Sequence, residues 1–472
     1  MLEVGEILRF IQDDAVSTKK RHAKKGLQYY EAEHDIKDYR VFYFDEDGLL
    51  KEDKTKSNIK ISHPFFTELI DQCTQYMLSG KTDIVRSDIP ELQTFLNEYF
   101  DDEFRMELSD LITYAKVEGF SYLYRYINED YRTAFKFADG LNVVEVEDKY
   151  SSDGNNYIIY YYFYKHDKDD DIYKVDVWDN QFVYHYFMQG NKITVDKENP
   201  KRAHVMYEED GQQYYDVLGD IPFIRLDNNR KQTSDLKVVK NLIDDYDLMA
   251  CGLSNNIQDM VEGIYVVKGF EGSDISELTN NIRVKKQVGV GENGDLDIKT
   301  IDIPYEARTK KLELDEKSIY KFGMGFNSNQ LGDGNITNVV IKSRYTLLDL
   351  KCNALEKQLK RFMKKIVKIV LDEINDVHNT NFTFKDVYFV FDREIITNAL
   401  DNAQIEQYKA NTKQIEINTL LNVASKLDDE TLVQNICEIL DIDYELIEDK
   451  LPKENLVDLN QATKDLEDGE DE

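Results

Sequence analysis

The chain has 472 residues, 41% of them hydrophobic and 12% aromatic, which allows about two to four structural units with sizeable cores. Its formal net charge of −33 would repel nucleic acid at long range, so a conventional DNA-binding domain is disfavoured. A protein through which duplex DNA only slides is not excluded, because a channel wall that does not neutralise the phosphates binds the DNA weakly and lets it move.

The four cysteines, Cys73, Cys251, Cys352 and Cys437, are far apart and form no CxxC pair. Neither a disulfide framework nor a zinc site is therefore expected, and the thiols should be reduced and mostly buried. The N-terminus has no apolar run of signal-peptide length, and no later stretch reaches transmembrane length without charge. These features predict a cytoplasm-like compartment.

The first half of the chain is predicted to be helical and then β-rich. Over residues 57–125, apolar residues recur at helical spacing, which predicts mainly helices. From Phe120 to about Ile224, β-branched and aromatic stretches alternate with Asp, Asn and Gly turns, which predicts short strands. The basic cluster within residues 19–25 is interpreted as a solvated helix face in preference to a nucleic-acid arm.

A long amphipathic helix is predicted over Asp235–Met260, directly after the capping residues Thr233 and Ser234. Its apolar side chains keep to one face, and polar ones, among them Asp244 and Asp247, lie opposite. One side would pack against the protein, and the other would meet water or a lumen.

A small β insert is expected after this helix. We predict a strand over residues 262–270 and a hairpin that turns at residues 291–294, where Gly and Asn cluster. A second helix, over about Tyr305–Phe322, returns from the insert. The two helices and the insert between them form an excursion from the main body, and its tip is a natural contact surface.

The segment after the second helix, residues 323–335, is rich in Gly and Asn and should be conformationally special. No Gly-Lys-Ser/Thr follows, so a nucleotide-binding loop is not predicted. A helix over about Thr337–Asn375 comes next. It carries a basic stripe, which consists of Lys357, Arg361, Lys364 and Lys368. This stripe either faces nucleic acid or pairs with acidic side chains across a subunit interface.

No catalytic or metal-binding motif stands out. The seven histidines occur in no HExxH or paired ligand spacing, and Asp45–Gly48 lacks a complete calcium ladder. Aspartates such as those at 169–171 would hold Mg²⁺ for nuclease chemistry only if carboxylates converged from several elements. A metal-dependent nuclease and a cytoplasmic adaptor are the alternative functions, and no cofactor is expected.

The order of these segments resembles the portal (head-to-tail connector) proteins of tailed bacteriophages, of the type found in phages of Gram-positive bacteria. The resemblance covers nearly the whole chain and is clearest over Ile221–Met260, Ile264–Phe270 and Phe322–Lys365. It implies an α+β portal fold with wing, stem, clip and crown regions. By segment, it places the wing at 1–234, the stem helices at 235–260 and 304–322, the clip at 261–303, the tunnel loop at 323–336, the long wing helix and wing strand at 337–394, a helical crown at 395–463 and a disordered acidic tail at 464–472.

The resemblance also implies a function without catalysis or a membrane. Family portals are twelve-subunit rings at one vertex of the virion capsid, assembled in the host cytoplasm, and double-stranded DNA passes through their channel during packaging and ejection. The implied partners are the terminase large subunit, a head-completion or adaptor protein, and the major capsid and scaffolding proteins. Implied site residues are Asn327, Ser328, Asn329, Gln330, Asp333 and Asn335 in the tunnel loop, and Arg283, Lys285 and Lys286 in the clip.

Overall fold

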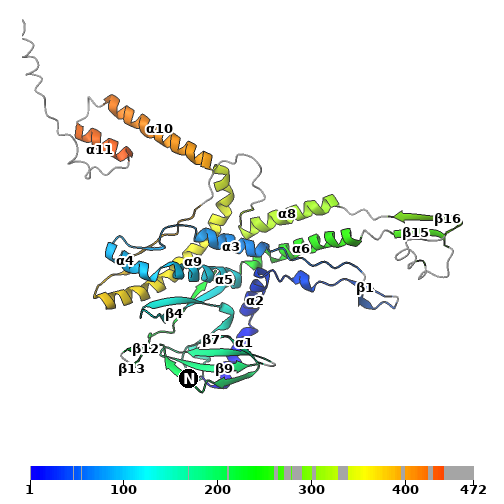
Figure 1. The fold of residues 1–472 in the computed structure, drawn as a ribbon, viewed down its shortest axis with the longest axis horizontal. Helices are drawn as coiled ribbons and strands as arrows, with labels where there is room; N and C mark the ends of the chain where they lie inside the picture. Colours follow the sequence, from blue (N-terminus) through cyan, green and yellow to red (C-terminus); the bar gives the residue numbers. More distant parts are fainter. Residues whose placement is uncertain are drawn as a thin grey trace, which may run out of the picture. The chain divides into compact units, whose positions relative to one another are not determined.

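The computed structural model describes residues 2–45, 47–54, 56–167, 170–209, 212–259, 264–270, 278, 290–299, 305–327, 338–394, 399–423 and 429–440. They belong to two compact units, one of residues 1–333 with 342–395 and the other of residues 334–341 with 396–472. The first unit combines helices with small antiparallel sheets (Figure 1), so the predicted α+β class is confirmed.

The N-terminal part of the first unit is mainly helical, as predicted. Its helices are α1 (Val4–Ala15), α2 (Thr18–Tyr30), the 3-10 helix η1 (Asp35–Asp38), α3 (Phe65–Met77), α4 (Pro90–Tyr99) and α5 (Asp102–Glu118). The ends of α5 follow from its sequence. The Asp101 carboxylate accepts the Phe104 N–H at 2.9 Å, and Gly119, with φ of 102°, ends the helix because glycine tolerates the left-handed conformation.

Two sheets follow α5 and confirm the predicted β-rich unit. In the three-stranded sheet, β4 (Phe120–Ile127) lies between β5 (Thr133–Ala138) and β14 (Phe223–Asp227). The six-stranded sheet has the order β10-β9-β8-β7-β6, with β11 paired to β9. Its strands are β6 (Val143–Val146), β7 (Tyr157–Asp167), β8 (Asp170–Trp178), β9 (Phe182–Gln189), β10 (Lys192–Val195) and β11 (Lys201–Ala203). Helix α1 packs on this sheet through Ile7 and Ile11.

Four smaller strand pairs complete the first unit. They are β1 (Phe42–Phe44) with β2 (Leu50–Glu52), β12 (Val205–Glu209) with β13 (Gln212–Asp216), β3 (Val85–Arg86) with β17 (Tyr388–Phe389), and β15 (Ile264–Phe270) with β16 (Val290–Lys299). The prediction of a hairpin turn at residues 291–294 is wrong, because these residues lie inside β16. The register shifts between Lys268 and Phe270, and Gly269 there approaches Gly294 so closely that an added Cβ would lie 3.2 Å from its Cα. The glycines accommodate a bulge.

The N-terminal basic cluster is only partly solvated, which corrects the prediction. Lys20 is 4% exposed, and its ammonium donates to carbonyl oxygens within residues 140–143 at 2.5 to 3.1 Å and lies 3.0 Å from Asp14. The Lys19 ammonium lies 3.7 Å from the centre of the Phe120 ring, and burial lowers its pKa to about 8. The spacing of lysines cannot reveal partners that come from distant strands.

The second unit contains helices α10 (Ala399–Val423) and α11 (Asp429–Leu440), which pack against each other. The prediction of helices without strands in this part of the chain is confirmed for these residues. Within the described ranges of the whole chain, no helix is long and apolar enough to cross a membrane.

A buried charge cluster connects four helices of the first unit: α5, α6 (Leu236–Asp259), α8 (Tyr305–Gly323) and α9 (Asn338–His378). Asp235, at the start of α6, lies 3.3 Å from the Lys116 ammonium and 3.0 Å from that of Lys351. Asn228 donates to its other oxygen at 2.7 Å, and Lys351 also donates to the Gly323 carbonyl at 3.0 Å. The start of α6 and the end of α8 therefore share one anchor.

The two lysines set the ionisation of this cluster. Burial alone would raise the pKa of the Asp235 carboxyl, but Lys116 and Lys351 outweigh it and hold that pKa well below its ordinary value. The pKa of Lys116 is correspondingly raised, since attraction to Asp235 outweighs the cost of burying its ammonium. The cluster is thus an ion triad.

Replacing Asp235 with asparagine should lower the free energy of unfolding by about 3–5 kcal/mol, because two buried ammonium groups lose their counter-charge. Urea unfolding at pH 7 measures the loss. Asp376→Asn, at an exposed position of α9, is the matched control and should change stability by less than about 0.5 kcal/mol. Because the folded pKa of Asp235 is depressed, its contribution is present above about pH 4 and is lost as pH falls further. Equal losses in both variants would contradict the role of the triad.

Candidate nucleic-acid interface

Helices α6 and α8 lie side by side and run in opposite directions, and β15 and β16 lie beyond their far ends (Figure 1). Near the body, Val239 and Ile243 of α6 share a core cluster with Ile319 and Tyr320 of α8. Farther out, Lys311 of α8 pairs with an aspartate on each helix, Asp245 and Asp315. The two predicted stem helices therefore form one antiparallel pair.

The polar face of α6 was predicted to meet water or a lumen, and for Asp247 this is wrong because its own subunit covers it, whereas the Asp244 side chain is 34% exposed. Asp247 is fully buried and accepts from Nδ1 of His34 at 2.6 Å and Nδ1 of His63 at 2.7 Å. Asp244 accepts from the Tyr29 hydroxyl and from the Lys240 ammonium. Burial alone would raise the pKa of Asp247, but the two histidines outweigh it and hold the pKa below its ordinary value. Both carboxylates therefore have internal partners.

An extended segment, residues 57–63, runs along this face and is called the strap here. Its alternate N–H groups, from Ser57, Ile59, Ile61 and His63, donate respectively to the side chains of Asp259 (3.1 Å), Asn255 (2.6 Å), Cys251 (3.2 Å) and Asp247 (3.0 Å). Two residues of extended chain advance about 6.6 Å, and four residues of helix advance about 6 Å. These repeats nearly match, so one ladder of bonds pins the strap to α6.

The first residues of the predicted tunnel loop are fixed on α3. A Cβ added to Gly325 would lie 2.2 Å from a Leu69 methyl carbon, and one added to Gly323 would lie 2.5 Å from another. The Gln72 amide donates to the Phe326 carbonyl at 2.8 Å and accepts the Phe326 N–H at 2.9 Å. These two glycines allow close packing here.

Most predicted loop and clip residues lie outside the described part of the chain. Only Asn327 is described, and its side-chain amide donates to Glu316 of α8 at 3.0 Å. The others are Ser328, Asn329, Gln330, Asp333 and Asn335 of the loop and Arg283, Lys285 and Lys286 of the clip. Their roles stay predictions.

The basic stripe of α9 is solvent-exposed in the isolated chain. Lys357, Arg361, Lys364 and Lys368 are all exposed, opposite a buried seam that includes Leu359. Lys364 lies 5.3 Å from the centre of the Phe384 ring, and none of the four forms an ion pair with a described residue. The spacing predicted the exposure correctly, and the surface that the stripe meets stays a prediction.

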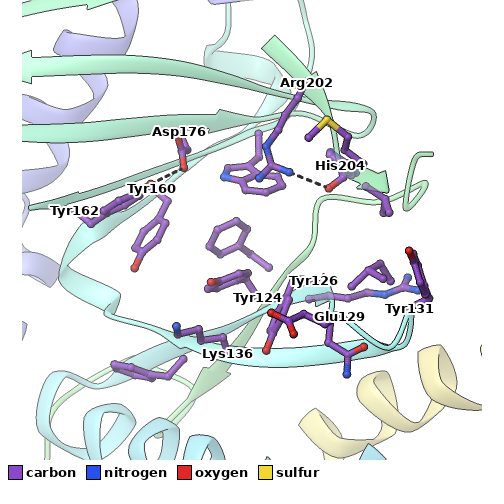
Figure 2. Close-up of a pocket in the computed structure, with 18 residues that line it drawn as sticks. Tyr124, Tyr126, Glu129, Tyr131, Lys136, Tyr160, Tyr162, Asp176, Arg202 and His204 are labelled. Atoms are coloured by element: carbon purple, nitrogen blue, oxygen red, sulfur yellow. Dashed lines mark hydrogen bonds between the residues drawn. The ribbon is translucent and has the colours of Figure 1, made fainter. Parts of the chain in front are cut away.

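A cavity of about 870 Å³ lies between the three-stranded and six-stranded sheets. Figure 2 shows tyrosines of both sheets, among them Tyr124 and Tyr160, pointing into it. Some of its polar groups bond within the wall, since Asp176 accepts from the Tyr162 hydroxyl at 3.3 Å and Arg202 donates to a backbone carbonyl. Trp178 Nε1 and His204 Nδ1, also in the lining, are buried and have no hydrogen-bond partner among the described residues.

The histidines occupy positions expected of structural residues. His34 and His63 bond to Asp247, and His185 Nδ1 lies 2.6 Å from the buried carboxylate of Asp176. Over the described ranges, no group of three or more His, Cys, Asp and Glu side chains is placed to hold a metal ion.

Replacing Asp247 with asparagine should loosen the strap, since this side chain accepts both from the strap and from two histidines. We expect a loss of about 1–3 kcal/mol in unfolding free energy at pH 7 and faster amide hydrogen exchange in residues 57–63. Because the pKa of Asp247 is depressed, wild-type stability should fall between pH 5 and 3, and this fall should be shallower in the variant.

Glu306→Gln, at an exposed position of α8, is the matched control and should leave strap exchange unchanged. Equal exchange in the Asp247 variant and this control would contradict the ladder.

Comparison with known proteins agrees with this architecture. Residues 11–449 match the family described as phage portal protein, SPP1 Gp6-like. The chain is 27% identical to the portal protein of Bacillus phage SPP1 over 379 residues, which are 79% of this chain and 74% of that protein. It is 26% identical to the portal protein of Clostridium phage phiCD119 (strain Clostridium difficile/United States/Govind/2006) over 425 residues, 86% of this chain and 89% of that protein.

The matched span contains the three-stranded and six-stranded sheets, the α6 and α8 pair, β15, β16 and the long helix α9. Both relatives are portal proteins of phages that infect Gram-positive bacteria, and the matching family is structural and not enzymatic. The chain belongs to the phage portal protein family of the SPP1 Gp6-like type.

Proposed function

We propose that this chain assembles into a closed ring of identical subunits at one capsid vertex and that duplex DNA passes through the central channel during packaging and ejection. Membership of the portal family over residues 11–449 carries the proposal. Heterologous contacts between unlike surfaces close into a ring when the rotation between subunits permits it. A ring of twelve subunits is the expected state in the virion.

The antiparallel pair α6 and α8 supports a conduit. The pair is anchored to the body at one end, by the Asp235 triad and the Gly325 contact, and carries β15 and β16 at the other. Repeated around a ring, such pairs would form the stem and the strands would form the clip. We assign the stem to residues 235–260 and 304–322 and the clip to 261–303.

The remaining regions follow the order of the chain. The wing is residues 1–234 with the long helix and strand at 337–394, and the crown is residues 395–463, followed by an acidic tail at 464–472. The tunnel loop was expected at 323–336, but its first residues pack on α3 and Asn327 donates to Glu316, so we place its free part after Asn327. Residues 328–335 would then offer amide and hydroxyl groups that hydrogen-bond phosphates without tight binding.

The charge of the chain suits passage of DNA. Each subunit carries a formal net charge of −33, and a continuous Lys or Arg lining would bind phosphates tightly and stall movement. We propose that the clip, through Arg283, Lys285 and Lys286, docks the terminase large subunit during packaging and a head-completion or adaptor protein afterwards. The wing and crown would contact the major capsid and scaffolding proteins.

The proposal predicts ring-shaped particles with a central hole wide enough for duplex DNA. Negative-stain electron microscopy of the full chain, alone and with scaffolding and capsid proteins, tests it. A chain that stays monomeric at every concentration and ionic strength, with and without those partners, would sink the proposal. Incubation with Mg²⁺ or Mn²⁺ and duplex DNA should give no cleavage, and cleavage abolished by Asp substitutions would establish the nuclease alternative.

We propose that the basic stripe of α9 pairs with an acidic surface of the neighbouring subunit, because every copy is strongly acidic. The test variant replaces Lys357, Arg361, Lys364 and Lys368 with glutamine. Ring formation by the wild type should weaken as salt rises, and the variant should assemble less and with a flatter salt dependence. Sedimentation velocity from low to high salt measures both.

The control makes the same charge change at exposed positions of the wing. It replaces Lys165, Lys192, Lys197 and Lys231 with glutamine. If the stripe variant assembles normally but packages less DNA, the stripe contacts DNA instead of a neighbouring subunit.

A further inference from the structure

The hairpin of β1 and β2 carries an apolar face that its own chain leaves uncovered. Phe42, Phe44, Leu49 and Leu50 are 52%, 73%, 61% and 59% exposed. The register pairs Phe44 with Leu50, and side chains alternate along strands, so Phe42, Phe44 and Leu50 share one face. Glu52, opposite Phe42, marks the edge of this face. Three large apolar side chains on one face of so short an element, with Leu49 in the adjoining turn, form a patch typical of a binding surface.

This element, residues 40–53, is called the arm here, and it is well formed. Its turn is held by Asp45, which accepts the N–H groups of Asp47 and Leu49, and ion pairs join Arg40 to Glu52 and Lys51 to Asp45. Two three-residue strands are nonetheless marginal in water without a surface to pack on. A surface that covers its apolar face would therefore stabilise the arm further.

Both ends of the arm are tied to the flank of α6. Before the arm, Asp35 of η1 lies 2.7 Å from the Lys240 ammonium. After it, the strap begins with Ser57, which donates to Asp259 at the far end of α6. The two legs are also bonded to each other, since Asn58 donates to the Tyr39 carbonyl at 3.2 Å. The arm is thus a fixed projection from the stem.

We propose that the apolar face of the arm docks on the stem of a second copy of this chain. This inference rests on the proposed ring. Subunits of a ring are related by rotation about the ring axis, so equivalent parts of neighbouring subunits lie at the same height along that axis. The arm would therefore meet the neighbour's stem at the level of the outer halves of α6 and α8. Ile257, Tyr305 and Leu314 are exposed there by 55%, 60% and 60%. Each copy therefore carries an exposed apolar face on its arm and exposed apolar side chains on its stem.

Charge favours the same pairing. At the turn of the arm, Asp47 is exposed and acidic, whereas Asp45 already pairs with Lys51. The outer face of α8 presents Lys310, Lys317 and Lys321 at helical spacing on the side of Leu314, and all are exposed. Lys317 and Lys321 form no ion pair with a described residue. The acidic, apolar arm and the lysine-lined outer face of α8, with its exposed leucine, are therefore complementary surfaces.

The first test is the variant Phe42→Ser, Phe44→Ser and Leu50→Ser in the full chain. The concentration needed for ring formation should rise at least about tenfold, because apolar burial between subunits is lost. Circular dichroism and the melting temperature of the monomer should stay at wild-type values, since these side chains contact little of their own chain. A matched control replaces the exposed residues Val16, Met106 and Tyr150 with serine and should assemble as the wild type does.

The second test locates the contact. A photo-crosslinking amino acid at position 44, in rings assembled from equal amounts of isotopically light and heavy chains, should give light-to-heavy cross-links to residues 248–259 or 305–323. Suppose that the wild type forms rings. The inference is then overturned, and the proposed function stands, if the triple variant assembles normally or if the cross-links form only within one chain or to other regions. A wild-type chain that never forms rings would overturn both.

Discussion

The ion triad of Asp235 with Lys116 and Lys351 is the constraint on which the rest of the structure depends. It lies where α6 begins, and through the Lys351 bond to the Gly323 carbonyl it also holds the end of α8. Both ends of the stem excursion are therefore fixed at one point of the body, beside α5 and α9. An ion cluster of this kind has strict geometry, because each buried ammonium must keep its carboxylate. A channel built from repeated stems requires such a fixed direction of departure.

The strap adds a second constraint farther out along the stem. Four of its N–H groups bond to α6 side chains at every fourth position, so one face of α6 is closed by its own chain. Along the stem, that closure leaves the outer face of α8, the exposed Ile257 of α6 and the arm accessible to other molecules. The polar residues of α6 that bind the strap therefore stabilise the subunit itself. In the proposed ring, the arm would extend this internal structure toward the next subunit.

Periodicity was enough to predict the stem helices, the long helix α9 and the β-rich unit, because each depends on local spacing of apolar residues. It failed where a distant segment changes the environment of a residue. Asp247 and Lys20 have polar side chains on amphipathic helices, yet both are buried by segments remote in sequence. Gly291 and Gly294 were expected to form a turn, but they lie inside β16, at a bulge between positions that pair with β15 on either side. Cys73 and Cys352, 279 positions apart, have sulfurs only 3.6 Å apart, which no spacing could reveal.

The central claim is that the α6 and α8 pairs of a closed ring surround the DNA channel. A reconstruction of the assembled ring at side-chain resolution measures directly which face of each stem lies toward the axis. The account predicts that the stems encircle a continuous channel and that the strap face of α6, with Asp247, is turned away from it. Stems on the outside of the ring, or a strap that lines the channel, would contradict the account.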